Sequence, residues 1–523
     1  MAVARPSVPP AMPAGVARLH FLYALLAGAI VPFAFAPYDL WPLAILALSA
    51  LLLLLRERSP AAAARLGWCF GLGMFGHGVW WIQVSVHQFG VPYYAFSVSM
   101  TALLVAFIAL YPALFAALLR ALPVRSNGLR LLLLAPALWV CSEWLRGWIF
   151  TGFPWLSLGY SQLDAPLAGL APWAGEHLCS VAVVFAAGLV ALGRDASWRA
   201  RAACLVALAA LFAGGQFLRS VPTSVETAAG LRVALVQAAI PQQLKWERSQ
   251  RDDAFRLYSA LSAPHWQADV VIWPETAIPA FADEVPEMMK SLEDTARQSG
   301  TSLLVGVPTG EPWSGGRYYN SVMALGREPG RYNKRHLVPF GEFFPFKSAL
   351  ENLTRLLDIP MSDFSEGELR QPTMHAAGHA VGVSICYEDV YAREVRRALP
   401  EAAFLVNVSN DAWFGDTIAP HQHLQIARMR ALESGRYLLR ATNTGITAII
   451  DERGRVTARA PQFEPTALSG RFAARSGATP YVRFGDLPLF GTLLVVIFAL
   501  VLHARRGAVL QATSKSAGGS PRQ

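Results

Sequence analysis

Charged residues are scarce in this chain of 523 residues, and they are scarcest in its first part. Only 15% of the residues are charged, 54% are hydrophobic, and the mean hydropathy is +0.34. No lysine precedes residue 219, and only six of the 36 acidic residues do. This composition excludes a fully water-soluble first part. It predicts a membrane-embedded region there, followed by a domain exposed to water.

Cysteine is also rare, and its placement is uneven. Four of the five cysteines lie in apolar stretches, whereas Cys386 lies in the polar domain without a second cysteine to pair with. A disulfide framework is therefore excluded in that domain, and Cys386 is expected to be a free thiol. Such a thiol is either a small buried hydrophobic group or a nucleophile.

Eight stretches are apolar and close to the roughly 20 residues that a helix needs to cross a bilayer. The connections at 36–40, 83–94 and 150–175 contain neither lysine nor arginine, and arginines flank the stretches on the other side. The positive-inside rule therefore predicts cytoplasmic termini and a periplasmic domain in a bacterial inner membrane. Arginines at membrane edges also explain the net charge of +9, so no nucleic-acid partner is expected. The eight stretches lie at about 19–36, 40–55, 66–82, 95–119, 129–149, 176–193, 201–218 and 484–503.

The chain is thus expected to contain four regions. They are a transmembrane bundle of about seven spans (1–220), a periplasmic domain (225–480), a final transmembrane helix (484–503) and a cytoplasmic tail (504–523) with disorder from 511. In the periplasmic domain, short β-branched runs alternate with amphipathic stretches, which predicts a layered α/β sandwich. Strands are expected at 231–238, 269–273, 302–307, 380–385 and 403–408, and helices at 284–299 and 389–398.

Two charged residues, Glu143 and Arg146, lie in the fifth apolar stretch and three positions apart, so they share a helix face. They can form an ion pair that locks the bundle, or they can serve a site, and the sequence leaves both open. The aromatic residues of the next connection, Trp155 and Tyr160 among them, are expected to form an interfacial belt.

Three polar residues of the second part lie where strands are expected to end. Glu275 follows the run DVVIW and a proline, Lys334 lies in a charged run that leads into an apolar turn, and Cys386 ends the run AVGVSI. A thiol is a few per cent ionised at neutral pH, so it needs a base or a cation nearby. Glu275 can take the thiol proton, and Lys334 can stabilise the oxyanion of a tetrahedral intermediate.

Nearby carboxylates are expected to support these three residues. Glu342 and Glu388 can orient Lys334. Asp389 can cap a following helix, whose N-terminus would then favour the thiolate of Cys386. Taken singly, each residue also fits a bland role, as a buried hydrophobic group, a loop carboxylate or a solvated charge.

The combination of these motifs resembles a known family. Trp273–Glu275, Tyr332–Glu342 and Cys386–Asp389 are similar to the three signature blocks of the carbon–nitrogen hydrolase (nitrilase) superfamily, and the resemblance covers about 225–470. Members of that superfamily use a Glu–Lys–Cys triad on an αββα sandwich. The resemblance therefore implies a nitrilase-like fold and catalytic roles for the glutamate, lysine and cysteine described above.

The membrane region narrows the resemblance. A nitrilase-like domain between several spans and one final span is similar to the apolipoprotein N-acyltransferases, as are 236–246 and Glu143–Arg146. This implies a thioester on Cys386 formed from the sn-1 ester of a phospholipid, typically phosphatidylethanolamine. The acyl chain would then pass to the N-terminal α-amine of a diacylglyceryl-cysteine apolipoprotein. No cofactor and no metal ion are expected. Trp246, Tyr387 and 340–346 are candidates for an acyl entrance or a lid.

Two other functions remain open at this stage. One is a membrane-tethered amidase or nitrilase that hydrolyses a small periplasmic substrate, for which a single membrane anchor would suffice. The other is a transporter with an accessory domain, which the few ionisable groups in the spans disfavour.

Overall fold

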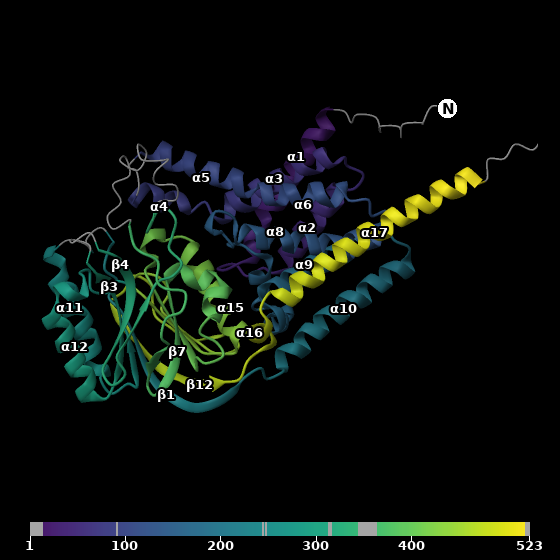
Figure 1. The fold of residues 1–523 in the computed structure, drawn as a ribbon. Coiled ribbons are helices and arrows are strands. Elements are labelled where there is room, and N and C mark those ends of the chain that lie inside the picture. Colours follow the sequence, from purple (N-terminus) through teal and green to yellow (C-terminus); the bar gives the residue numbers. More distant parts are fainter. Residues whose placement is uncertain are drawn as a thin grey trace, which may run out of the picture.

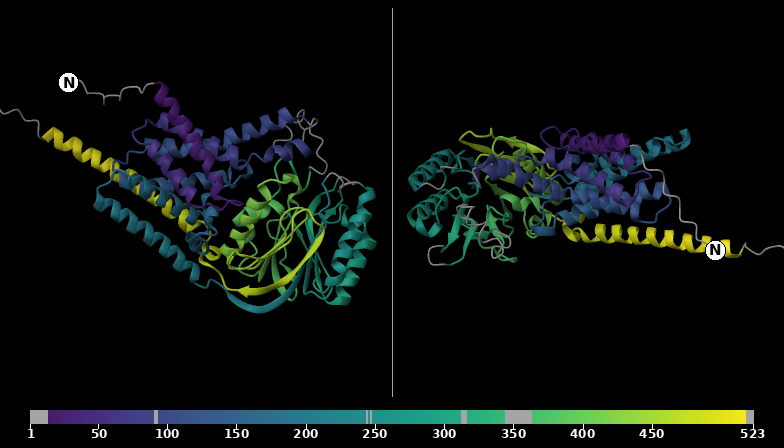
Figure 2. Two further views of the ribbon diagram at one scale, coloured as in Figure 1. Left: turned by 180° about the vertical axis from the view of Figure 1, so that it is seen from behind. Right: turned by 90° about the horizontal axis from the view of Figure 1, so that it is seen from above.

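The computed structural model describes residues 14–89, 93–242, 245, 248–311, 316–343 and 363–517. These residues form a helical bundle and an α/β sandwich that lie side by side (Figure 1). The first part of the chain builds the bundle. The last helix, α17, leaves the sandwich and runs back along the bundle, where it packs on α8 (Figure 2).

Helices overlap all eight of the apolar stretches. Among the described residues, five helical segments are long and apolar enough to cross a membrane, and two shorter helices are also apolar. The chain is therefore a membrane-associated protein. The helices of the bundle are α1 (Ala14–Ile30), α2 (Pro42–Leu54), α3 (Pro60–Gly78), α4 (Ile82–Phe89), α5 (Tyr94–Ile108), α6 (Leu110–Ala121), α7 (Asn127–Leu129), α8 (Ala135–Arg146), α9 (Ala171–Gly193), α10 (Trp198–Ser220) and α17 (Leu487–Ala517).

Small residues let helices of the bundle approach closely. A Cβ on Gly28 of α1 would lie 1.9 Å from the carbonyl oxygen of Phe70 on α3, and a Cβ on Gly73 of α3 would lie 2.0 Å from that of Leu25 on α1. Close packing of this kind supplies van der Waals attraction where lipid removes the hydrophobic driving force. By contrast, the apolar windows of α10 and α17 are 11% and 17% buried, which leaves apolar faces for lipid.

Two features of this region differ from the expectations. α17 continues to Ala517, so 511–517 is helical rather than disordered, in a segment that contains several good helix formers. The expected interfacial belt is also wrong for Trp155 and Tyr160, which are each 1% exposed. Their polar atoms contact the sandwich instead, through residues of the helix α15.

Two six-stranded mixed sheets form the sandwich. Their strand orders are β12-β1-β2-β3-β4-β5 and β11-β10-β9-β8-β7-β6. In each sheet three central strands are parallel and the outer strands are antiparallel to their neighbours. All five expected strands are present. The strands are β1 (Val225–Gln237), β2 (Val270–Ile272), β3 (Ser302–Gly310), β4 (Tyr318–Leu325), β5 (Gly330–Asn333), β6 (Met374–Ala376), β7 (His379–Ile385), β8 (Phe404–Ser409), β9 (Leu438–Thr442), β10 (Ala448–Ile450), β11 (Val456–Arg459) and β12 (Thr466–Ser476).

Side-chain alternation along the strands explains the layers. On β1, Val233 and Leu235 point between the sheets, while Ala234 and Val236 point outward. Each fully buried Val or Leu stabilises the fold by roughly 1.5–3 kcal/mol. Helices α11 (Arg248–Ser262) and α12 (Pro286–Ser299) cover one outer face, and α14 (Ala392–Arg396) and α15 (Ala419–Ser434) cover the other. The expected αββα sandwich is thereby confirmed (Figure 1).

Helix α15 joins the sandwich to the bundle. One face packs on the second sheet. On the other face, Gln422 Oε1 accepts hydrogen bonds from the indole nitrogens of Trp81 and Trp155, at 3.2 and 2.7 Å. Arg430 forms a buried ion pair with Glu176 of α9 at 3.2 Å. The sandwich is thus held against the bundle by buried polar contacts as well as by apolar packing.

Candidate active site

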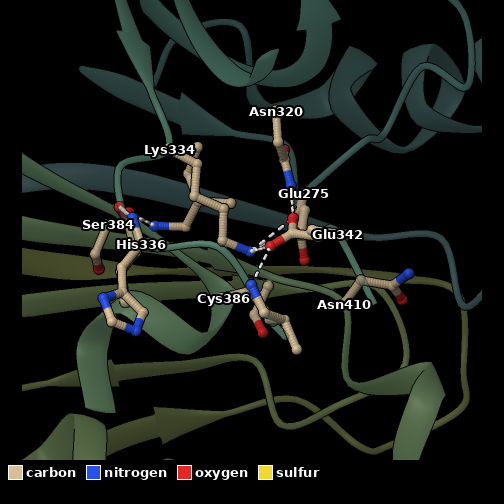
Figure 3. Close-up of polar contacts among 12 residues, drawn as sticks. Glu275, Asn320, Lys334, His336, Glu342, Ser384, Cys386 and Asn410 are labelled. Atoms are coloured by element: carbon tan, nitrogen blue, oxygen red, sulfur yellow. Dashed lines mark hydrogen bonds and ion pairs between the residues drawn. The ribbon is translucent and has the colours of Figure 1, made fainter. Parts of the chain in front are cut away.

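Glu275, Lys334 and Cys386 come together at the carboxyl ends of strands (Figure 3). Glu275 follows β2, Lys334 follows β5, and Cys386 follows β7 and begins the short 3-10 turn η9 (Cys386–Val390). The three residues are 7%, 1% and 8% exposed. Lys334 Nζ lies 3.5 Å from Glu275 Oε1, and both side chains point toward Cys386. The sequence blocks that carry them therefore converge on one buried site.

The loop after β2 holds Glu275 in place. Gly306 of β3 permits a close approach, because a Cβ there would lie 2.2 Å from the carbonyl oxygen of Pro274. Asn320 Nδ2 donates to Glu275 Oε1 at 2.7 Å. The buried Lys245 donates from Nζ to the main-chain oxygen of Glu275 at 3.0 Å. The carboxylate is thus fixed through both its side chain and its backbone.

Lys334 bridges two carboxylates. Its Nζ lies 2.9 Å from both carboxylate oxygens of Glu342, in addition to the contact with Glu275. Asn320 Nδ2 also donates to Glu342 Oε1 at 2.9 Å, so this amide ties the two carboxylates together. Burial opposes a charge on Lys334, but Glu342 and Glu275 outweigh it and raise the pKa of the amine. Lys334 is therefore a fixed positive charge at neutral pH.

Cys386 has an unusual backbone and a protonated thiol. Its φ of +51° lies in the left-handed region, which non-glycine residues rarely adopt. Burial raises the pKa of the thiol, Glu275 raises it further, and Lys334 offsets only part of this. The expected lowering by a helix N-terminus is wrong, because η9 and α14 are only five residues each. The thiol needs a proton acceptor rather than a helix dipole.

Glu388 was expected to orient Lys334, but its carboxylate binds backbone nitrogens instead of the lysine side chain. Among the described residues, no hydrogen bond or ion pair joins it to the Lys334 ammonium. It fixes the segment after β5 relative to the end of β7, and so sets where Lys334 and Cys386 lie. Its hydrogen-bond donors are the backbone nitrogens of Ile385, Arg335 and His336, at 2.8, 2.6 and 3.1 Å, and the hydroxyl of Tyr332, at 3.0 Å.

Of the candidates for an acyl entrance, Tyr387 contacts the connection that follows α8. The Tyr387 ring stacks on Trp155, with centroids 6.4 Å apart. Burial raises the pKa of Tyr387 to about 12, so it is a neutral phenol. Phe340 is 50% exposed. Trp246 and 344–346 lie outside the described residues.

Glu143 and Arg146 do not form the ion pair that was one of their two expected roles. Each is 3% exposed, and each binds the connection that follows α8. Glu143 Oε1 accepts from the backbone nitrogen of Leu158 at 2.8 Å. Arg146 donates to the carbonyl oxygens of Phe153, at 2.7 Å, and of Trp155. They hold in place the loop that contacts the sandwich.

A second buried polar cluster lies behind Cys386, and we call it the His423 cluster: Asp389, Asp411, His423 and Arg440. His423 of α15 lies between the two carboxylates, with Nε2 2.8 Å from Asp389 and Nδ1 2.9 Å from Asp411. Arg440 of β9 donates to both carboxylates at 3.0 Å. All four residues are at most 1% exposed, so Asp389 belongs to this cluster and does not cap a helix.

The His423 cluster predicts a pH-dependent contribution to stability. Burial and Arg440 oppose protonation of His423, but Asp389 and Asp411 outweigh them and raise its pKa to about 9. This stabilisation is full below the ordinary value near 6.5 and is lost as the pH rises through 9. His423→Gln is therefore expected to lower the free energy of unfolding by about 3 kcal/mol at pH 6, and by less at pH 9.5.

Thermal unfolding of the detergent-solubilised protein across this pH range measures the effect. His421→Gln is the matched control, because His421 lies on the same helix and its pKa is lowered, by burial and by Arg459. An equal loss of stability for His423→Gln at pH 6 and pH 9.5 would show that the imidazolium contributes nothing.

Sequence reasoning missed Asn320, Lys245 and the His423 cluster. A signal existed for Asn320, which with Ser321 is polar in a strand of otherwise aromatic and apolar residues, YYNSVMAL. Lys245 carries no comparable signal, since its role depends on contact with a loop 30 residues away. Among the described residues, no group of three or more His, Cys, Asp or Glu side chains is arranged to hold a metal ion.

The sandwich and its buried glutamate, lysine and cysteine define a carbon–nitrogen hydrolase domain, and the matching family models agree. The carbon–nitrogen hydrolase family model matches residues 232–481. A model of the apolipoprotein N-acyltransferase N-terminal domain matches residues 27–189. A variant of the Nesterenkonia AN1 amidase, from the nitrilase superfamily, is 18% identical with a TM-score of 0.37, covering 51% of this chain and 98% of that one.

Relatives that match nearly the full length identify the family. The apolipoprotein N-acyltransferase of Methylococcus capsulatus is 45% identical over 492 residues, covering 93% of this chain and 97% of the relative. That of Vibrio cholerae is 43% identical, covering 90% and 94%. The chain belongs to the apolipoprotein N-acyltransferase family, and it is an enzyme.

Proposed function

We propose that this chain transfers a fatty acyl chain from a phospholipid, through a thioester on Cys386, to the N-terminal α-amine of a diacylglyceryl-cysteine apolipoprotein. The observation that carries the proposal is the buried contact of Lys334 with Glu275 beside Cys386, in a member of an N-acyltransferase family. Phosphatidylethanolamine is the proposed donor.

In the first half-reaction Glu275 acts as the base. It takes the thiol proton as the sulfur of Cys386 attacks the sn-1 ester carbonyl. The tetrahedral oxyanion forms beside the ammonium of Lys334, which stabilises it by charge. Collapse of the intermediate breaks the ester C–O bond. Glu275 returns the proton to the leaving oxygen, so lysophospholipid leaves and the thioester remains.

The second half-reaction uses the same groups in reverse order. The acceptor amine attacks the thioester carbonyl and gives a proton to Glu275. The oxyanion again forms next to Lys334. Collapse breaks the C–S bond, and the sulfur of Cys386 regains a proton from Glu275. An amide has formed, the enzyme is restored, and no cofactor takes part in the balance.

The proposed substrates explain why the domain is held on a bundle. Both have acyl chains anchored in one leaflet of a bilayer, so a catalytic domain fixed at that surface raises the effective concentration of the ester at the thiol. We place the domain 225–480 in the periplasm, with the bundle 1–220 and the helix 484–503 in the inner membrane and the tail 504–523 in the cytoplasm. The distribution of arginines supports this orientation.

The transfer itself predicts a specific acceptor. Enzyme first loaded with phosphatidylethanolamine carrying a labelled sn-1 chain is expected to pass the label to a diacylglyceryl-cysteine peptide with a free α-amine. The N-acetylated form of the same peptide is the matched control. It carries the same lipid anchor, but its blocked α-amine cannot attack the thioester. Mass spectrometry of the peptide and of free fatty acid measures the two products.

The alternative of a membrane-tethered hydrolase gives a different result. In that case the label appears as free fatty acid at the same rate with either peptide. Such an outcome rejects the transferase proposal while leaving the thioester on Cys386 intact.

A further inference from the structure

The backbone of Cys386 is held in a conformation that needs support. A left-handed φ at a residue other than glycine costs of order 1–3 kcal/mol and persists only where the surroundings enforce it. The parallel register of β7 and β8 pairs Ser384 with Asn407 and Ile385 with Val408. Cys386 and Ser409 each come directly after the last of these pairs, Cys386 just past the end of β7 and Ser409 as the last residue of β8.

Asn407 supports the backbone of Cys386. Its Nδ2 donates to the carbonyl oxygen of Cys386 at 3.3 Å and to Ser384 Oγ at 3.1 Å. Arg440 Nη1 donates to Asn407 Oδ1 at 2.5 Å, which orients the amide so that its NH2 group faces the cysteine. Asn407 and Arg440 are both fully buried, so no water competes for these bonds.

Ser409 supports the sulfur of Cys386. Its hydroxyl donates to Asp411 Oδ1 at 2.9 Å, and Ser409 stands beside Cys386, since both come directly after the last pair of the β7–β8 register. Interaction with the Ser409 side chain lowers the pKa of Cys386. With its proton on Asp411, the hydroxyl can accept the S–H; once the thiol is ionised, it can turn and donate to the sulfur. Asp411 is itself held by His423 and Arg440.

We propose that Asn407 and Ser409 are positioning residues for the Cys386 nucleophile, one acting on its backbone and the other on its sulfur, and that the His423 cluster anchors both. The proposal rests on the nucleophilic role proposed above for Cys386. Asn407 is bonded to Arg440 and Ser409 to Asp411, and both of these partners belong to the His423 cluster. The nucleophile is therefore held from behind, while the Lys334–Glu275 pair lies on its other side.

The two arms predict different losses. Ser409→Ala removes the contact to sulfur, and the thiol should ionise less readily, since that hydroxyl lowers the pKa of Cys386. We expect the pH midpoint of iodoacetamide alkylation at Cys386 to rise by about one unit, with a tenfold slower reaction at neutral pH. The other charged groups that face the sulfur are unchanged in this variant: Glu275, Lys334, Lys245 and Asp411.

Asn407→Asp tests the backbone arm. The variant keeps the size of the side chain and the contact with Arg440, but the new carboxylate cannot donate to the carbonyl oxygen of Cys386. We expect single-turnover thioester formation with phosphatidylethanolamine to slow about tenfold or more, while the KM for the phospholipid stays near that of the wild type.

Ser262→Ala is the matched control, because Ser262 is also fully buried and hydrogen-bonded, but on the far side of the first sheet. Mass spectrometry of the Cys386 peptide reads both alkylation and acylation. A Ser409→Ala profile and rate equal to those of Ser262→Ala would overturn the proposal for the sulfur. Unslowed acylation in Asn407→Asp would overturn it for the backbone. If wild-type Cys386 is alkylated but never acylated, the proposed function fails, and the alkylation profile still tests Ser409.

Discussion

Cys386→Ser is expected to lose thioester formation and acyl transfer by roughly four to six orders of magnitude, while its fold is retained. A serine hydroxyl is far less acidic than a thiol, so Glu275, which suffices as the proton acceptor for sulfur, cannot generate the alkoxide. The substitution replaces the sulfur by an oxygen and leaves the rest of the side chain unchanged. Intact-protein mass after incubation with phosphatidylethanolamine measures the acyl adduct, and thermal unfolding checks the fold.

Cys69→Ser is the matched control for this prediction. Cys69 is a free, partly buried cysteine of the bundle that lies far from the strand ends of the sandwich. It should keep wild-type acylation. An acyl adduct on the Cys386→Ser protein, in the amount found for the wild type, would show that another residue carries the acyl chain.

The central strands can be predicted because their signal is local. Runs such as 302–307 and 403–408 are short, apolar and rich in β-branched residues, as strands buried on both faces must be. The pairing of strands depends on distant contacts instead. Leu235 of β1 pairs with Leu468 of β12, more than 200 residues later. The sequence of neither segment indicates which strand it pairs with. The sheet orders therefore come from the structure.

The predicted helix at 389–398 shows how tertiary contacts override a local pattern. Its polar residues fit a helix start, but Asp389 forms buried ion pairs with Arg440 and His423. The carboxylate of Glu388 accepts hydrogen bonds from the backbone nitrogens of Arg335 and Ile385, which belong to two other segments. The segment therefore splits into a 3-10 turn and the short α14. Where polar side chains serve a buried site, periodicity alone misleads.

The candidate site divides in the same way. Glu275, Lys334 and Cys386 could be predicted because their motifs are specific and each stands at a strand end. The groups that position them, Asn320 and Lys245, lie elsewhere in the chain. Their relevance rests on distances of about 3 Å that no sequence spacing encodes.

The buried Trp155 lies at the contact between the bundle and the sandwich. Trp155 stacks on Tyr387, the neighbour of Cys386, and its indole nitrogen donates to Gln422 of α15. The Trp155 ring also lies 5.8 Å from His423, measured between ring centroids. Trp155 thus contacts both Tyr387, the neighbour of the proposed nucleophile, and the His423 cluster. The bundle is part of the site's framework as well as its anchor.

Lys334→Met is expected to lower both stability and activity, for separable reasons. It leaves the buried Glu275 and the partly buried Glu342 next to each other without their cation, which costs about 3–5 kcal/mol. Loss of the oxyanion's partner should slow thioester formation by about 10²–10³-fold.

The double variant Lys334→Met/Glu342→Gln separates the two effects. Replacing one carboxylate by a neutral amide removes the repulsion between the two, so much of the lost unfolding free energy should return. Thioester formation should stay as slow as in Lys334→Met, because the positive charge beside the reacting carbonyl is still missing. Thermal unfolding measures the stability of both variants, and single-turnover acylation measures their activity. If the double variant regains activity together with stability, Lys334 acts by holding the fold and not on the oxyanion.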